Sequence, residues 1–430
     1  MDDTDQATAA QASADGPALA VETVRPWHVR MRGRDPTEPH RAVTPLELFF
    51  DLVFVVALAG AAELFHNAVA DGDVAYGVGV FLIVFFAVWW PWVQFSYFAS
   101  AYDTDDVLYR LLTFIQMAGV LVVAAGTERV FAALDFRILV GGYVIMRIAY
   151  VAQLLRVARE DPVGREVALR FAVGIAAIQV LWVLRLAIGP PLGIALVVVL
   201  GVGEMLIPLW AERSGRRTPW HPAHIAERYA LFTIIVLGEC VFAPTTAVRA
   251  ATEAGAPWMA LITLSVGGLL LVFAMWWSYF KAPAQILRLT EPRGQFAWGY
   301  GHFVIFVAVV ALGAGLQVAV EAVTDPEHVS SLTAGLAVGV PTALFAASVA
   351  VLHRRGRPWR EMAPLAVGAV VALAIGATAG IVAVPVVVLA IGVLMAGLAA
   401  WRIYSAWRSS PAAGFELAEE EEGVDIHGSS

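Results

Sequence analysis

Apolar stretches of about 20 residues recur along the chain from position 46 to position 407, with no long polar block between them. A helix of about 20 apolar residues crosses the hydrocarbon core of a bilayer. The pattern therefore predicts an all-α, polytopic integral membrane protein with about twelve transmembrane helices. The expected spans are residues 44–66, 76–98, 108–126, 135–155, 168–188, 192–211, 225–247, 257–280, 297–320, 332–352, 362–381 and 384–407. The last two are the hardest to separate, because only Val382, Ala383 and their neighbours lie between them.

The amino-acid composition supports the same class of protein. Of the 430 residues, 59% are hydrophobic and 15% are charged, whereas a soluble domain has roughly a quarter charged residues. The single cysteine, Cys240, excludes an internal disulfide and a cysteine-based metal cluster. No strongly basic segment with interleaved aromatic residues indicates nucleic-acid binding. The expected partners are the lipid bilayer and an unknown small solute or ion.

The ends of the chain and its positive charges predict an orientation. Residues 1–42 have no apolar core and no basic start leading into an apolar run, so they predict a disordered cytoplasmic tail rather than a signal peptide. Residues 410–430 predict a second, acidic and disordered tail. With the N-terminus inside, most of the 28 Lys and Arg residues lie on the inner side, and only Arg129, Arg137 and Arg249 lie in outer loops. This bias predicts a plasma-membrane protein with both termini in the cytoplasm.

Three short motifs recur in the same order at a nearly constant offset. Asp51–Phe54 matches Glu239–Phe242, Phe86–Trp90 matches Phe273–Trp277, and Ser96–Phe98 matches Ser278–Phe280. The chain is therefore expected to contain two six-helix units, residues 43–211 and 212–409. Because six is an even number of crossings, both units enter the membrane in the same direction, as in the parallel repeats of transporters.

Several longer motifs are those of a known family. They are Glu47–Ala59 (ELFFDLVFVVALA), Tyr102–Asp106 leading into Arg110, Gly142–Arg147, Glu227–Glu239 and Gly301-His302. On these motifs the chain resembles the bacterial low-temperature-requirement protein A (LtrA) family over nearly its whole length between the tails. The resemblance implies an integral membrane protein whose family name records a growth phenotype in the cold, and it implies no settled biochemical activity. One departure is Cys240, where the family often has a serine.

Asp51 and Glu239 place carboxyl groups far inside predicted spans. Each lies about ten residues, or roughly 15 Å, beyond a basic residue at the expected cytoplasmic flank, Arg41 or Arg228. A charged side chain near the bilayer centre costs at least ~2.5–3.5 kcal/mol, so such residues are functional candidates by default. The alternative is that they hold helices together through buried hydrogen bonds.

Other polar side chains extend this candidate site. Glu204 and Arg147 reach a similar depth from the outer side, so three deep acids face one deep arginine. At least one carboxyl is therefore expected to be protonated, or to meet water or a cation. The remaining candidates are Glu47 on the face of Asp51, Arg228 on the face of Glu239, and His302 as a proton relay.

Paired tryptophans mark two of the spans. Trp89 and Trp90 precede Pro91, and Trp276 with Trp277 repeats the pair. A proline inside a span kinks it, and kinked spans often border cavities. The four tryptophans are therefore candidate cavity-lining residues, although an aromatic belt at the membrane interface is the favoured alternative.

From the sequence we expect no enzyme activity, no metal site and no cofactor site. It has no nucleophile–base pairing, metal-ligand motif or phosphate-binding loop. The acidic run Asp103–Asp106 lacks the alternating ligands and the glycine turn of a calcium loop. One of its residues is expected to cap the third span or to pair with Arg110.

Three functions are compatible with these patterns. The first is a proton-coupled secondary transporter with its site between the two halves, which is favoured by twelve spans, a parallel repeat and acids at equivalent positions. The alternatives are an ion or proton channel, and a membrane-homeostasis or lipid-interacting factor without transport. A shared site predicts that Asp51, Glu239 and Arg147 face one polar cavity, whereas acids in separate dry interfaces would indicate a role in helix packing.

Overall fold

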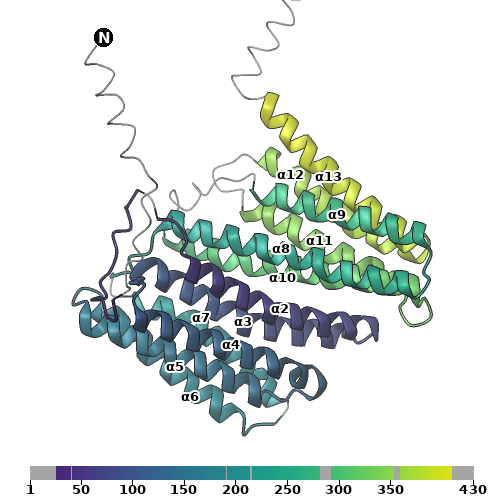
Figure 1. Cartoon of the computed structure of the whole chain (residues 1–430). Helices are drawn as coiled ribbons and strands as arrows, with labels where there is room; N and C mark the ends of the chain where they lie inside the picture. Colours follow the sequence, from purple (N-terminus) through teal and green to yellow (C-terminus); the bar gives the residue numbers. More distant parts are fainter. Residues whose placement is uncertain are drawn as a thin grey trace, which may run out of the picture.

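The expected spans are helices in the structure, a computed structural model that describes residues 26–39, 41–189, 191–213, 216–280, 292–352 and 359–408 (Figure 1). Within these ranges the chain is all-helical, and twelve helices are long and apolar enough to cross a membrane. They are α2 (Pro45–Ala70), α3 (Val74–Tyr102), α4 (Val107–Ala133), α5 (Arg137–Glu160), α6 (Arg165–Arg185), α7 (Leu192–Ala211), α8 (Pro222–Glu253), α9 (Trp258–Phe280), α10 (Pro292–Thr324), α11 (Ser331–Leu352), α12 (Trp359–Ala377) and α13 (Val384–Arg408). The predicted fold class is confirmed, and a short 3-10 helix (Thr378–Gly380) divides the last two spans.

Local capping signals explain where the helices begin. The Thr44 side chain accepts a hydrogen bond from the Glu47 backbone, and the Glu47 side chain accepts one from the Thr44 backbone. Pro45 occupies the first turn of α2, where its missing N–H has no intrahelical partner to lose. Asp106 caps α4 by accepting from the Tyr109 N–H at 2.8 Å, as expected for one residue of the acidic run.

The helices form two groups that meet along α2 and α10 (Figure 1). In the first group α4 packs against α2 and α5, and in the second α10 packs in the same way against α8 and α11. The central helix is α10, whose apolar stretch is 83% buried. The recurring neighbours agree with the predicted parallel repeat, which stays a prediction, as does the cytoplasmic placement of both termini.

The two groups differ at one helix pair. In the second group α9 lies along α13, so closely that a Cβ on Gly267 would come within 2.7 Å of the Leu389 backbone. The corresponding helices of the first group, α3 and α7, touch only weakly. Two cavities are lined by residues of both α3 and α7. The first group is therefore the more open of the two.

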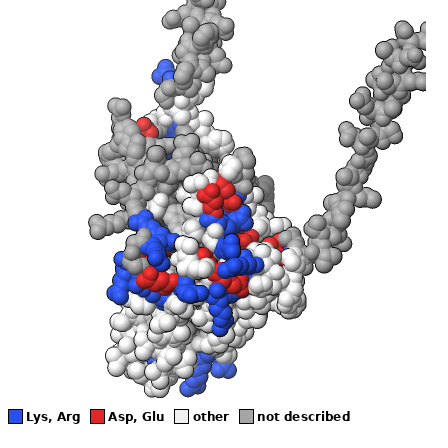
Figure 2. Space-filling view, turned by 90° about the vertical axis from the view of Figure 1, so that its left-hand side faces the viewer, with Lys and Arg blue, Asp and Glu red and all other residues white. Residues whose placement is uncertain are grey.

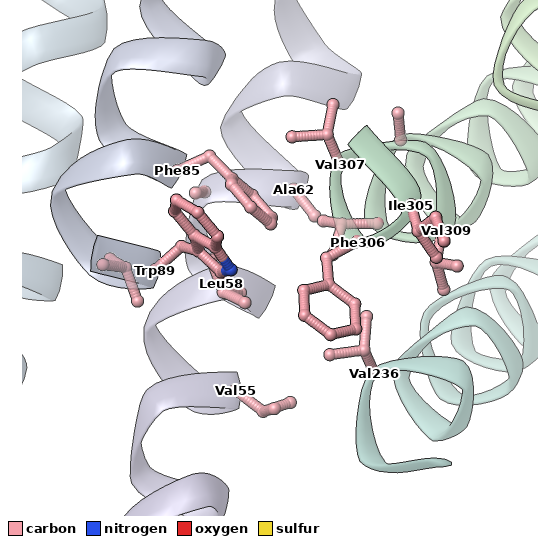
Figure 3. Packing of buried hydrophobic residues seen from close by; sticks show 14 of the residues in the cluster. Val55, Leu58, Ala62, Phe85, Trp89, Val236, Ile305, Phe306, Val307 and Val309 are labelled. Carbon is pink, nitrogen blue, oxygen red and sulfur yellow. The ribbon is translucent and has the colours of Figure 1, made fainter. Parts of the chain in front are cut away.

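Apolar side chains form the core between the two groups (Figure 3). Val55 and Leu58 of α2 face Val236 of α8 and Phe306 of α10, and none of the four is more than 7% exposed. In a bilayer the stabilisation comes from close packing, because lipid tails are as apolar as the side chains that they would replace. The interface of the two groups is thus dry around these residues.

Residues 26–39 form an extended segment, here called the N-terminal strap, that binds one end of the bundle. The Val29 N–H donates to Asp106 at 2.7 Å, and the Met31 N–H donates to Glu160 at 2.6 Å. The Met31 side chain is fully buried. The expectation of a disordered tail is therefore wrong for residues 26–39. Residues 1–25 and the expected acidic tail 410–430 lie outside the described residues.

Charged side chains gather at the same end of the bundle (Figure 2). This view faces the left-hand end of Figure 1, where the strap approaches the bundle. Blue and red atoms cluster there, against a mostly white surface elsewhere in the view. It is the end that the bias of Lys and Arg predicts to be cytoplasmic.

We expect Gly142→Ala to weaken the contact between α4 and α5. A Cβ at Gly142 would lie 2.6 Å from the Gly119 carbonyl oxygen, so the helices must separate, at a cost of about 1–3 kcal/mol. Gly141→Ala is the matched control, because a Cβ there meets nothing within 4 Å. Thermal unfolding in detergent should give a lower Tm for Gly142→Ala and an equal or higher Tm for Gly141→Ala. Equal Tm values for the two variants would contradict the close contact between α4 and α5 at Gly142.

Candidate functional site

A buried ion pair joins Arg147 of α5 to Glu204 of α7 in the first group. Their Nη2 and Oε2 atoms are 3.1 Å apart, and the two side chains are 2% and 0% exposed. The Trp90 indole N–H and the Gln179 amide both donate to Glu204, at 3.1 and 2.9 Å. Arg147 in turn donates to Tyr143 and Gln94. We call these six residues the Arg147–Glu204 cluster, and its formal charges cancel.

A second buried ion pair joins Asp51 of α2 to Arg228 of α8, across the two groups. Arg228 Nη2 lies 2.6 Å from Asp51 Oδ1, which also accepts from the Trp92 indole at 2.7 Å. Glu47 lies 3.5 Å from Arg228 and 3.3 Å from His224. The Ser96 hydroxyl accepts from Arg228 at 3.2 Å. We call Glu47, Asp51, Trp92, Ser96, His224 and Arg228 the Asp51–Arg228 cluster.

The charges of the Asp51–Arg228 cluster do not cancel without a bound proton. Two carboxyl groups and one imidazole share one guanidinium, and the side chains of all four are at most 1% exposed. An uncompensated charge in such a site costs several kcal/mol, so the group takes up a proton instead. Glu47, Asp51 and His224 are the groups of the cluster that can hold such a proton, which belongs to the cluster as a whole. The sequence-based expectation of a proton-binding carboxyl stays a prediction, and this cluster is its candidate site.

Helix α3 serves both clusters from opposite faces. Residues two apart on a helix point about 200° apart. Trp90 and Gln94 therefore reach the Arg147–Glu204 cluster, while Trp92 and Ser96 reach the Asp51–Arg228 cluster. Pro91 stands between the two tryptophans, inside the helix. The two indole N–H groups donate to two different carboxylates.

Two cavities lie on either side of the Arg147–Glu204 cluster. The first, here called the aromatic cavity, has a volume of about 70 Å³. Its wall includes Trp90, Gln94, Tyr97, Tyr150, Glu212 and Tyr300. The second has a volume of about 220 Å³ and an almost entirely apolar wall from α3, α5, α6 and α7 that includes Tyr143. The cluster thus contributes to both walls and separates the two spaces.

The shared cavity expected for Asp51, Glu239 and Arg147 is not what the structure contains. Asp51 and Arg147 lie in different clusters, and Glu239 is half-buried on α8 without an ion pair to any of the described residues. The sequence-based count of one deep arginine is also wrong. Arg228 is not at a cytoplasmic flank, because α8 begins at Pro222 and carries Arg228 inward to the level of Asp51.

His302 of α10 is a packing histidine and contacts neither cluster's carboxylates. Its Nδ1 is 2.8 Å from the Trp298 carbonyl oxygen, and its Nε2 is 3.1 Å from the Tyr279 hydroxyl. Its ring also packs against Tyr229 and Phe306. No cluster carboxylate is among these contacts, and the expected role of His302 as a proton relay stays a prediction.

The four tryptophans proposed to line a cavity have different surroundings. Trp90 lines the aromatic cavity, whereas Trp89 is fully buried and packs on Phe303, with ring centroids 5.0 Å apart. Trp276 and Trp277 are 43% and 44% exposed on α9, where they suit contact with lipid. The resemblance between the two tryptophan pairs therefore does not extend to their environment.

Several members of the two clusters were not predicted as site residues from the sequence. They are Trp92, His224 and the amides Gln94 and Gln179. The available signal was weak: an amide inside an apolar span must find a partner, but its position does not say which one. Within the described ranges, no group of three or more His, Cys, Asp or Glu side chains is placed to bind a metal.

The fold and its buried clusters define a multi-pass helical membrane protein. The family described as bacterial low temperature requirement A protein (LtrA) matches residues 42–400, and the chain belongs to this family. A relative in Rhizobium meliloti (strain 1021), described as uncharacterized protein RA0937, is 27% identical over 307 residues. The match covers 67% of this chain and 72% of that protein.

We expect Arg147→Met to destabilise the protein by about 3–5 kcal/mol, because it leaves Glu204 buried without its cation. The double variant Arg147→Met with Glu204→Gln should recover most of this loss, since no uncompensated charge remains. Chemical unfolding in detergent compares the two free energies. A double variant as unstable as the single one would show that packing, and not charge, makes Arg147 necessary.

Asp103, which follows α3 outside the spans, predicts a pH effect on stability. Burial, assisted by the charge of Glu47, raises the pKa of Asp103 to about 6, against the opposing effect of nearby arginines. The folded protein therefore holds this proton more tightly than the unfolded chain. The stabilisation is complete below about pH 4 and is lost as the pH rises through about 6, by as much as about 3 kcal/mol. Asp103→Asn should flatten the Tm profile between these pH values, and an unchanged slope would contradict the assignment.

Proposed function

We propose that the protein is a secondary transporter of the cell membrane that couples the movement of a small solute to a proton. The observation that carries the proposal is the position of the Arg147–Glu204 cluster, a fully buried charge pair with a cavity on either side. A transporter needs such a closed centre between two spaces, each of which opens in turn.

The weak contact between α3 and α7 supports a solute path between these two helices. Both cavities draw wall residues from α3 and α7, and the packing that closes the equivalent place in the second group is missing here. Trp90, Glu204 and Tyr143 close the path at its centre. Movement of α3 or α7 opens one cavity to the other only if the hydrogen bonds of Glu204 rearrange.

The proton site supports coupling through α3. We place the coupled proton in the Asp51–Arg228 cluster between the two helix groups, where Trp92 of α3 donates to the Asp51 carboxylate. Two residues earlier, Trp90 of the same helix donates to Glu204. Loss or gain of the proton changes the strength of the hydrogen bond from Trp92 to Asp51. Helix α3, which contains Pro91, transmits that change to Trp90.

A channel is less well supported by the same geometry. Conduction needs a path through which ions pass without reordering the protein, whereas an ion pair with both side chains buried separates the two cavities. We therefore treat a channel as the alternative outcome of the transport experiment.

Proton movement in liposomes tests the proposal. Liposomes with the purified protein and an internal pH dye would receive a panel of amines, amino acids, organic acids and sugars. We expect a saturable proton flux that depends on one class of solute and falls at least tenfold in Asp51→Asn and in Arg147→Gln. Glu239→Gln is the matched control and should keep the flux, because Glu239 lies outside both clusters.

Two results would contradict the transporter. A flux that needs no solute and does not saturate would indicate a channel. A solute-dependent flux that persists at the normal rate in Asp51→Asn and Arg147→Gln, with both variants folded, would remove the clusters from the mechanism.

A further inference from the structure

We propose that the aromatic cavity binds a small organic cation, a protonated or quaternary amine, with Glu212 as its counter-charge. The inference rests on the proposed function for the role of this cavity as the solute entrance. Binding itself depends only on the wall of the cavity.

Aromatic rings make up much of that wall. They come from α3, α5, α6, α10 and the loop before α8, and include Tyr97, Tyr150, Trp220 and Tyr300. The face of an aromatic ring attracts a cation, by about 0.5–1 kcal/mol when exposed and about 2 kcal/mol or more when desolvated. Several rings around one space therefore favour a ligand with a spread positive charge over a neutral one of the same shape.

Glu212 gives the wall its charge. It is the one charged residue among the described residues of the wall, and no Arg or Lys is found there. Its Oε1 accepts from the backbone and the hydroxyl of Thr218, at 3.1 and 2.8 Å. These bonds aim a carboxyl group at the cavity from the end of α7. An anionic ligand would therefore meet this carboxyl, and no Arg or Lys among the described residues of the wall.

The burial of Glu212 agrees with this assignment. Burial raises the pKa of Glu212, and the opposing charge of Arg217 from the following loop is a smaller influence. A cation in the cavity would stabilise the ionised carboxylate and oppose this effect of burial. Arg147 does not compete for the site, because Glu204, Tyr143 and Gln94 already accept its hydrogen bonds.

The volume limits the ligand to a small one. About 70 Å³ of the cavity is open to the centre of a water-sized sphere, so the ligand must be a compact ammonium ion. Choline fits this description and has a neutral carbon isostere, 3,3-dimethyl-1-butanol. The pair differs in charge and hardly in shape, so it separates attraction to a cation from simple burial of apolar surface.

Calorimetric titration of the full-length protein in detergent tests the inference. We expect choline to bind at least tenfold more tightly than 3,3-dimethyl-1-butanol, and Glu212→Gln to abolish most of this preference. Glu128→Gln is the control, since Glu128 is an exposed acid on α4 away from the cavity. Equal binding of choline and its isostere to the normal protein would overturn the proposal.

A second variant pair covers the case in which Glu212→Gln does not fold. Trp220 lies in the loop before α8, so its replacement leaves the membrane helices intact. Trp220→Phe keeps a ring and should keep the preference for choline, whereas Trp220→Leu should reduce it severalfold. Preservation of the preference in Trp220→Leu and in folded Glu212→Gln would overturn the cation site.

The liposome experiment separates this inference from the proposed function. Choline that binds selectively but drives no proton flux would support the cation site and count against transport. A proton flux driven only by another class of solute, together with equal binding of choline and its isostere, would support transport and overturn the cation site.

Discussion

The neutralisation of charge between apolar helices is the constraint on which this structure depends. Arg147 and Arg228 each have a carboxylate partner between the helices, and each of these two carboxylates also accepts an indole N–H from α3. A buried indole needs an acceptor, and a buried carboxylate needs donors. The pairing of Trp90 with Glu204 and of Trp92 with Asp51 therefore sets the rotation and the height of α3 between its neighbours.

The same constraint distinguishes the two groups of helices. In the second group, glycines allow α9 and α13 to pack backbone against backbone. In the first group, an ion pair and its amide and indole donors stand between α3 and α7, where they keep the helices apart and leave cavities on both sides. Polar groups thus act as spacers here, and the proposal of transport rests on the space that they maintain.

The sequence predicted the helices well and the site less well, for a physical reason. About 20 consecutive apolar residues suffice to predict a span, so all twelve were found, with errors only at their ends. The partner of a buried charge depends on which helices are neighbours and at what height. The expectation that Arg228 lies at the cytoplasmic end of its span misplaced it by more than a helical turn. The repeat suggested that Glu239 shares a site with Asp51. Arg228 holds that place instead. The repeat motifs resemble each other in sequence, but Asp51 and Trp90 of the first copy are buried, whereas Glu239 is half-buried and Trp277 is 44% exposed in the second.

The N-terminal strap has a consequence for the order in which the molecule forms. Its residues are synthesised before those of helices α2 to α8, yet the Val29 N–H binds Asp106, 77 positions later, and the Met31 N–H binds Glu160, 129 positions later. The Glu38 carbonyl oxygen also lies 2.9 Å from His221 Nε2, 183 positions later. The strap therefore has no complete binding site until the chain has been synthesised as far as the start of α8. Its attachment links the ends of helices made at different times, so that a segment made before these helices takes its final place after them.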